Sequence, residues 1–327
     1  AYTATFEIMP EFPEIDVASL EVHRASAEVT DADIDRMLET LRLQRRSFEE
    51  VERASIDGDF VMFEYAAVAG DYRFPAEGLE RAGSVLGSGT LFAALDEALA
   101  GHQKGDKFDA EIVFPQDFRN EQLAGKTAAV SFHLIKVQEP KLPAIDGEFA
   151  KLFGIEDGDL EKFRKEVRAN LERELKAALM ARLKSEVAEK LADAHGGLDV
   201  PNMMVQAEAR SLAVGSVPQG QQPPPQLIDA AMPIARKRVI AGLLMGEIAR
   251  KQGLKIDRTR IAEQLAAIAS TYEEPEQVIE LYNRDPQLMS GLQNRVMEDQ
   301  VAEWVAEHAR TTRQDLSFDD VMRPANA

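Results

Sequence analysis

The sequence predicts an α+β protein in which a small strand-rich domain is joined to a larger, mostly helical part. Between about residues 56 and 139, three segments alternate or run apolar as strands do, and one short helical segment interrupts them. From about residue 140 onward, apolar residues recur at helical spacing over several long stretches. A chain of 327 residues with 45% hydrophobic content is long enough to form two separate cores.

Residues 1–50 are predicted to be a connector of strands plus one helix. "AYTATFEIMPEFPEI" alternates like a strand and lacks the basic start and apolar stretch of a signal peptide. A second strand is expected in "LEVHRASAEV", and the period becomes helical in "TDADIDRMLETLRLQRRSFEE". Thr30 and Asp33 match a short-armed capping box at the start of this helix. Because the chain begins at Ala1 in the middle of a pattern, we expect it to be part of a longer protein.

The strand-rich domain is predicted to span residues 51–139. Its strands are expected in "FVMFEYAAV", "KFDAEIVF" and "AAVSFHLIKV", and its helix from about residue 90 to Gly101. Gly87-Ser88-Gly89 is glycine-rich, as phosphate-binding loops are. However, "GSGTLF" lacks the Lys-Ser/Thr ending of such a loop and the glycine spacing of a dinucleotide-binding motif. We therefore expect a turn, with Ser88 or Thr90 capping the helix.

Residues 140–327 are predicted to be helical. The longest helix is expected over 160–194, which contains no Gly or Pro. Its apolar residues first share one side, at Leu160, Phe163, Val167, Leu171 and Leu175. They then drift to the opposite side, at Leu179, Leu183, Val187 and Leu191. This drift indicates that the helix leaves one packed body and enters another.

Further helices are expected at about 201–216, 226–251, 257–271 and 286–310. The first two are separated by "VPQGQQPPPQ", an uncharged, Pro-rich segment that is typical of a semi-rigid hairpin tip.

Composition excludes several function classes. A net charge of −19 disfavours direct contact with nucleic acid or anionic membranes, and no apolar run approaches the ~20 residues of a membrane span. The chain has no cysteine, and its five histidines are dispersed without ligand spacing, so we expect no metal site. No G-x-S-x-G motif accompanies its serines. We therefore expect no cofactor and no covalent catalysis.

The remaining functional signal is apolar. Eight of the eleven methionines follow residue 140, and methionine-rich surfaces adapt to irregular protein partners. Next to the hairpin tip, we expect contacts with polypeptide substrates from Met203, Met204, Val205, Leu212, Val214, Leu227, Ile228 and Met232. The alternative for these side chains is ordinary packing between two helices.

The sequence resembles the bacterial trigger factor family, ribosome-associated chaperones with a peptidyl-prolyl isomerase domain. "EVTDADIDRMLETLRLQ" resembles the family's linker helix, and "AGHQKGDKFDAEIVFP" resembles its FKBP-type domain. "FGIEDGDLEKFRKEVRANLERELKAALMARLKS" and "ASTYEEPEQVIELYNRDPQLMSGLQNRVMEDQ" resemble its C-terminal helical body. The resemblance implies an elongated, cytoplasmic molecule with two helical arms that binds unfolded and nascent polypeptides without ATP. The family's N-terminal domain, with its Gly-Phe-Arg-x-Gly-Lys loop, is expected to be missing, and with it the route to the ribosome.

By motif position, the resemblance also implies a proline pocket formed by Tyr65, Phe74, Leu91, Phe92, Leu95, Phe118 and Val130. Leu95 departs from the family of FKBP-type domains, whose pocket has an aromatic floor at this position. Prolyl isomerisation breaks no bond, so an apolar pocket that favours the twisted amide is sufficient for catalysis. We expect low but measurable isomerase activity. A dedicated isomerase and a non-catalytic scaffold remain the alternatives to a chaperone.

Overall fold

The computed structural model describes residues 11–218, 220–272 and 274–323, and the chain divides into two compact units. One, the sheet unit, is Asp31–Val167. The other, the helical unit, joins the N-terminal segment through Thr30 to the chain from Arg168 onward. Most of the strand expected in the first fifteen residues lies outside the described residues. The three-part division into residues 1–50, 51–139 and 140–327 remains a prediction.

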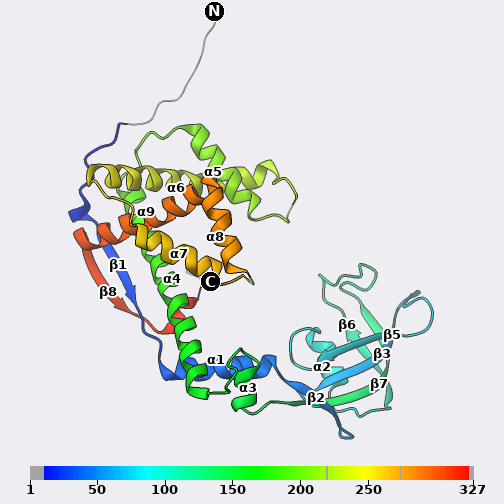
Figure 1. Cartoon of the computed structure of the whole chain (residues 1–327). Helices are drawn as coiled ribbons and strands as arrows, with labels where there is room; N and C mark the ends of the chain where they lie inside the picture. Colours follow the sequence, from blue (N-terminus) through cyan, green and yellow to red (C-terminus); the bar gives the residue numbers. More distant parts are fainter. Residues whose placement is uncertain (1–10, 219, 273, 324–327) are drawn as a thin grey trace, which may run out of the picture. The chain divides into compact units, whose positions relative to one another are not determined.

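The sheet unit contains a six-stranded antiparallel sheet (Figure 1). Its strands are β2 Ser47–Glu50, β3 Phe60–Ala69, β4 Tyr72–Phe74, β5 Glu80–Val85, β6 Lys107–Val113 and β7 Thr127–Lys141. The hydrogen-bonded order is β2-β7-β3-β4, with β5 also paired to β3 and β6 to β7. The central strands β3 and β7 alternate between buried and more exposed residues, as the sequence predicts, and Phe63 and Leu134 point into the core.

Helix α2 (Ala93–Leu99) packs on this sheet, and its start corrects one prediction. Neither Ser88 nor Thr90 caps it: Phe92 is the N-cap residue, without a side-chain hydrogen bond. Ser88 Oγ instead donates to the Val85 carbonyl at 2.6 Å. Gly87 has a φ of +72°, and a Cβ there would collide with the Asp57 carboxylate. The glycines therefore form a tight turn ahead of the helix rather than its first turn.

Helices α1 (Asp31–Gln44) and α3 (Gly147–Lys151) complete the sheet unit together with the first residues of α4. Ile34 and Leu38 of α1 are buried, as the predicted apolar face requires. Phe163 of α4 stacks with Phe153, with ring centroids 5.3 Å apart.

Helix α4 (Leu160–Ala194) has the predicted bounds and contributes to both units. Phe163 belongs to the sheet unit, whereas Leu183, Val187 and Leu191 lie in the core of the helical unit. The boundary between the units falls after Val167, inside this helix. The predicted passage of this helix from one packed body into another is therefore confirmed. Leu160, however, is 37% exposed, and Leu171 and Leu175, predicted with the first body, belong to the helical unit.

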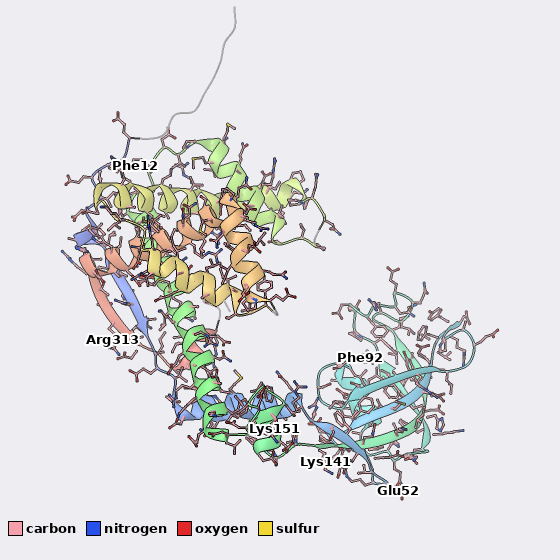
Figure 2. The ribbon with its side chains drawn as sticks, in the orientation of Figure 1. Phe12, Glu52, Phe92, Lys141, Lys151 and Arg313 are labelled. Carbon is pink, nitrogen blue, oxygen red and sulfur yellow. The ribbon has the colours of Figure 1, made fainter. Side chains whose placement is uncertain are left out.

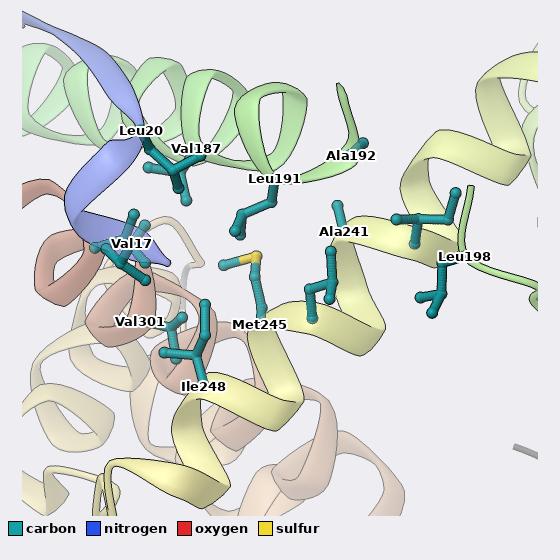
Figure 3. Close-up of a cluster of buried hydrophobic side chains, with 14 of the residues drawn as sticks. Val17, Leu20, Val187, Leu191, Ala192, Leu198, Ala241, Met245, Ile248 and Val301 are labelled. Atoms are coloured by element: carbon teal, nitrogen blue, oxygen red, sulfur yellow. The ribbon is translucent and has the colours of Figure 1, made fainter. Parts of the chain in front are cut away.

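The helical unit contains the remaining helices and a two-stranded parallel sheet. Its helices are η1 Val17–Ser19, α5 Asn202–Val214, α6 Pro225–Lys251, α7 Arg258–Ala269, α8 Pro275–Arg284, α9 Pro286–His308 and α10 Phe318–Met322. Its strands are β1 Glu21–Ser26 and β8 Arg310–Asp315. Figure 3 shows the core, where Leu191 of α4 and Met245 of α6 lie close to one another. None of the described helices is long and apolar enough to cross a bilayer.

Candidate functional site

The seven residues of the predicted proline pocket all belong to one apolar cluster of the sheet unit. They come from separate elements that the sheet brings together: Tyr65 lies on β3, Phe74 ends β4, Phe92 precedes α2, and Val130 lies on β7. Figure 2 labels Phe92 beside α2. The structure therefore brings these residues together, as the resemblance implies.

Two groups of aromatic rings belong to this cluster. The rings of Tyr65 and Phe74 are 6.2 Å apart between centroids. Phe92 lies 5.7 Å from Phe118 in an edge-on arrangement and 5.2 Å from Phe114. Phe114 is a member of this group that the sequence analysis did not name. Its position in the "FP" segment beside the predicted Phe118 was the available signal.

The burial of these residues separates pocket walls from supporting core. Tyr65, Phe74, Leu91, Phe92 and Phe118 are half-buried, so part of each side chain is accessible to a ligand. Val130 is only 1% exposed and Leu95 only 8%. Both side chains lie in the core of the sheet unit, so Val130 is corrected from a contact residue to a core residue, and the role of Leu95 as the pocket floor stays a prediction.

Tyr65 contributes a phenol group to this cluster. Burial raises the pKa of the Tyr65 phenol, and the nearby Glu80 carboxylate acts in the same direction. The phenol therefore stays protonated near neutral pH and is able to donate a hydrogen bond to a substrate carbonyl.

The α5–α6 hairpin presents the predicted methionines to solvent. Met203 is 73% exposed, Met204 39% and Val214 51%. Leu212, Leu227, Ile228 and Met232 are half-buried, and all except Leu227 pack against the core of the helical unit. Ile234, which the sequence analysis did not name, is 57% exposed on α6.

Val205 is the one hairpin residue for which the prediction is wrong. It is 4% exposed and lies in the core with Ala209 and Ala213, four and eight residues later on α5. This spacing of small apolar residues marks the buried face of a helix, and it was visible in the sequence. Met203 and Met204 precede Val205 on other faces of the same turn.

A second exposed apolar set lies where α7, α8 and α9 meet. Tyr272 is 58% exposed, Leu281 54% and Leu288 36%, and helix α8 has no fully buried residue. The sequence analysis left α8 out, although Pro275 at its first turn and the apolar Val278, Ile279 and Leu281 were signals for an amphipathic helix.

The described residues contain no group of three or more His, Cys, Asp or Glu side chains arranged to hold a metal ion. The accessible features are apolar side chains on helices and half-buried aromatic rings beside α2. Together they define the class of protein: a helical body with exposed apolar side chains, joined to a small antiparallel-sheet domain that carries a half-buried aromatic cluster.

The comparisons with known proteins identify the family. The family model described as "Bacterial trigger factor protein (TF) C-terminus" matches residues 159–307, and the one described as "Bacterial trigger factor protein (TF)" matches residues 1–41. A trigger factor of Xanthomonas euvesicatoria pv. vesicatoria is 51% identical over 98% of this chain and 76% of its own length. That of Stenotrophomonas maltophilia is 48% identical over 99% of this chain and 77% of its own length. The chain belongs to the trigger factor family of chaperones.

Among solved structures, one described as "Promiscuous Substrate Recognition in Folding and Assembly Activities of the Trigger Factor Chaperone" aligns with a TM-score of 0.45 and 14% identity. The alignment covers 91% of this chain and 73% of that one. The family assignment rests on the sequence relatives.

Proposed function

We propose that this protein is an ATP-independent chaperone that holds unfolded and nascent polypeptides on exposed apolar side chains of its helical unit, in the cytoplasm. The observation that carries the proposal is the exposure of Met203, Met204 and Val214 on one helical hairpin. Long, unbranched methionine side chains adapt to irregular partners, and burial of apolar surface is worth about 25 cal/mol per Å². The exposed Tyr272 and Leu281 supply a second set of contacts.

Weak, exchangeable contacts of this kind suit a chaperone that releases its client without a nucleotide. Each contact buries only part of one side chain, so the complex dissociates when the client buries its own apolar residues. The absence of cysteine from the chain is compatible with a reducing compartment.

Suppression of aggregation tests this proposal. A thermally unfolded client protein is mixed with an equal amount of this chain, without ATP, and light scattering is followed. We expect scattering to fall in proportion to the chaperone added, for several unrelated clients. Suppression of a single client only, at a fixed stoichiometry, would instead indicate a scaffold.

We also propose that the sheet unit catalyses prolyl isomerisation at a low rate. The support is the set of half-buried side chains in one apolar cluster of the sheet unit, together with the aliphatic Leu95 at the position that the resemblance gives to the pocket floor. An apolar pocket favours the twisted amide, whereas a floor without a flat ring leaves the proline ring less firmly placed. The rate on a short proline peptide tests this point, and a rate equal to that of an FKBP-type enzyme with an aromatic floor would contradict it.

A further inference from the structure

The β1–β8 pair in the helical unit has an open edge. β1 and β8 run parallel from Glu21↔Arg310 to Ser26↔Asp315 without a break in register. In Figure 1, β8 lies on the outer side of β1, and its residues are exposed over its whole length. Parallel strands normally belong to larger sheets with covered faces, so a two-stranded parallel sheet is incomplete by comparison.

The hydrogen bonds identify which backbone groups of β8 are available. Arg310 N donates to Leu20 O and Leu316 N to Ser26 O, each at 2.9 Å. Because N–H and C=O groups alternate in direction along a strand, the even-numbered residues of β8 face β1. Thr311, Arg313 and Asp315 therefore direct their backbone N–H and C=O groups to the outer edge. Within the described part of the chain, these groups have no hydrogen-bond partner.

Three of the six residues of β8 are charged, which opposes strand addition, but other features that block it are absent. The β8 segment Arg310–Asp315 contains no proline and no lysine, and its pairing with β1 has no bulge. Arg313 Nε contacts the Asp315 carboxylate at 2.7 Å, so these two charges compensate each other. Arg310, at the start of the edge, forms no ion pair with any described residue, although Glu21 of β1 is its partner in the strand register. A partner strand with a carboxylate near Arg310 matches this charge.

A groove lies beside the same strands. It has a volume of about 870 Å³, and Thr311 and Arg313 of β8 line it together with Arg24 of β1. Apolar side chains line it from α4, among them Leu179 and Met180, and from Val29 after β1. Charged side chains, such as Glu172, Lys176 and Glu303, line it as well. A strand added next to β8 would direct every second side chain to the face on which Thr311 and Arg313 lie. Apolar side chains at those positions would therefore point toward the groove side of the sheet.

We propose that the outer edge of β8 binds an extended segment of an unfolded client as a third strand. The segment alternates apolar side chains on the groove face with polar ones on the outer face and carries a carboxylate opposite Arg310. This inference rests on the proposed chaperone function, and it adds a second mode of recognition: backbone hydrogen bonding to an extended segment, in addition to apolar contacts with the helices.

A pair of substitutions at one position tests the backbone contact. Arg313→Pro removes a backbone N–H group from the outer edge and leaves the backbone N–H and C=O groups of Thr312 and Gln314, which face β1. Proline is tolerated on an edge strand when its nitrogen faces outward. Arg313→Ala removes the same side chain but keeps the N–H group. The probe is a fluorescent ten-residue peptide that alternates leucine and threonine and contains one glutamate. We expect at least 10-fold weaker binding to Arg313→Pro than to Arg313→Ala, with equal melting temperatures.

Two N-methylated forms of the peptide provide the test on the unmodified protein, even if Arg313→Pro fails to fold. N-methylation of one alternate set of residues removes the amides that face β8, and N-methylation of the other set leaves them. We expect only one form to lose binding. Equal binding of both forms, or protection of the β8 edge amides that rises with protein concentration in the absence of peptide, would overturn the proposal. The second result would assign the edge to another copy of this chain. If Arg313→Pro still suppresses aggregation, the apolar helical contacts account for the chaperone activity without the β8 edge.

Discussion

Removal of the exposed apolar groups of the α5–α6 hairpin should weaken client binding without unfolding the protein. The variant combines Met203→Gln, Met204→Gln and Val214→Thr. Glutamine resembles methionine in length and helix propensity, and threonine has the shape of valine. Since the three side chains are 73%, 39% and 51% exposed, their substitution should lower the free energy of unfolding by no more than about 2 kcal/mol each.

The size of the binding effect follows from these exposures. Full burial of a methionine or valine side chain is worth about 1.5 to 3 kcal/mol. Scaled by the exposed fractions, complete burial of the three by a client would contribute about 2.5 to 5 kcal/mol. Binding recovers only part of such a value, so we expect a loss of about 1.5 to 2.5 kcal/mol. That loss corresponds to a Kd about 10- to 70-fold higher.

Fluorescence anisotropy with a labelled, reduced and carboxymethylated client provides the assay. The matched control is Leu43→Gln with Leu152→Gln, which removes exposed leucines (44% and 56%) from the sheet unit. We expect the control to bind as the parent does. A triple variant that binds within 2-fold of the parent, with an unchanged melting curve, would refute the assignment of these side chains to client contact.

Three further predictions concern other parts of the chain. Val205→Ser should lower the free energy of unfolding, measured in urea, by about 2 to 4 kcal/mol, because it places a hydroxyl in a well-packed site. A change under about 0.5 kcal/mol would show that Val205 does not lie in the core. Phe92→Ala should reduce the isomerase rate on a proline peptide about 10-fold and leave the suppression of aggregation unchanged. Leu152→Ala is the control. An unchanged isomerase rate would show that Phe92 does not contribute to the pocket. The Arg250 guanidinium lowers the pKa of Glu247, so their pair stabilises the fold fully above the ordinary glutamate pKa near ~4 and loses this contribution as pH falls through the lower folded value. Arg250→Met should therefore lower the melting temperature at pH 7 and converge with the parent once the pH is below the folded pKa of Glu247. An equal difference at neutral and at acid pH would contradict the linkage.

Features set by local periodicity could be predicted from the sequence. The bounds of α4 and its passage from one packed body into another follow from residues that are three and four positions apart, and the structure confirms both. The main strands β3, β6 and β7 are likewise recognisable from alternation and apolar runs. The grouping of the pocket residues, in contrast, came from the family resemblance, because residues as distant as Tyr65 and Phe118 share no local pattern.

Features set by distant contacts could not be predicted. The parallel pairing of Glu21 with Arg310 joins opposite ends of the chain, and β8 has no apolar face by which to recognise it. The close approach of Asp57 to Gly87, in the turn ahead of α2, is likewise encoded by no local propensity. Val205 is different. Its spacing to Ala209 and Ala213 already indicated the buried face of a helix, but the prediction grouped it with the adjacent methionines as an exposed residue.

Photo-crosslinking tests the central claim most directly. A photoreactive benzophenone amino acid replaces Met203, Leu281 or Leu152 in turn, and each protein is irradiated with an unfolded client in the absence of nucleotide. Adducts from positions 203 and 281, with none from 152, are the predicted result. Adducts of equal yield at all three positions, or only at 152, would contradict a chaperone that holds its clients on the exposed side chains of the helical unit.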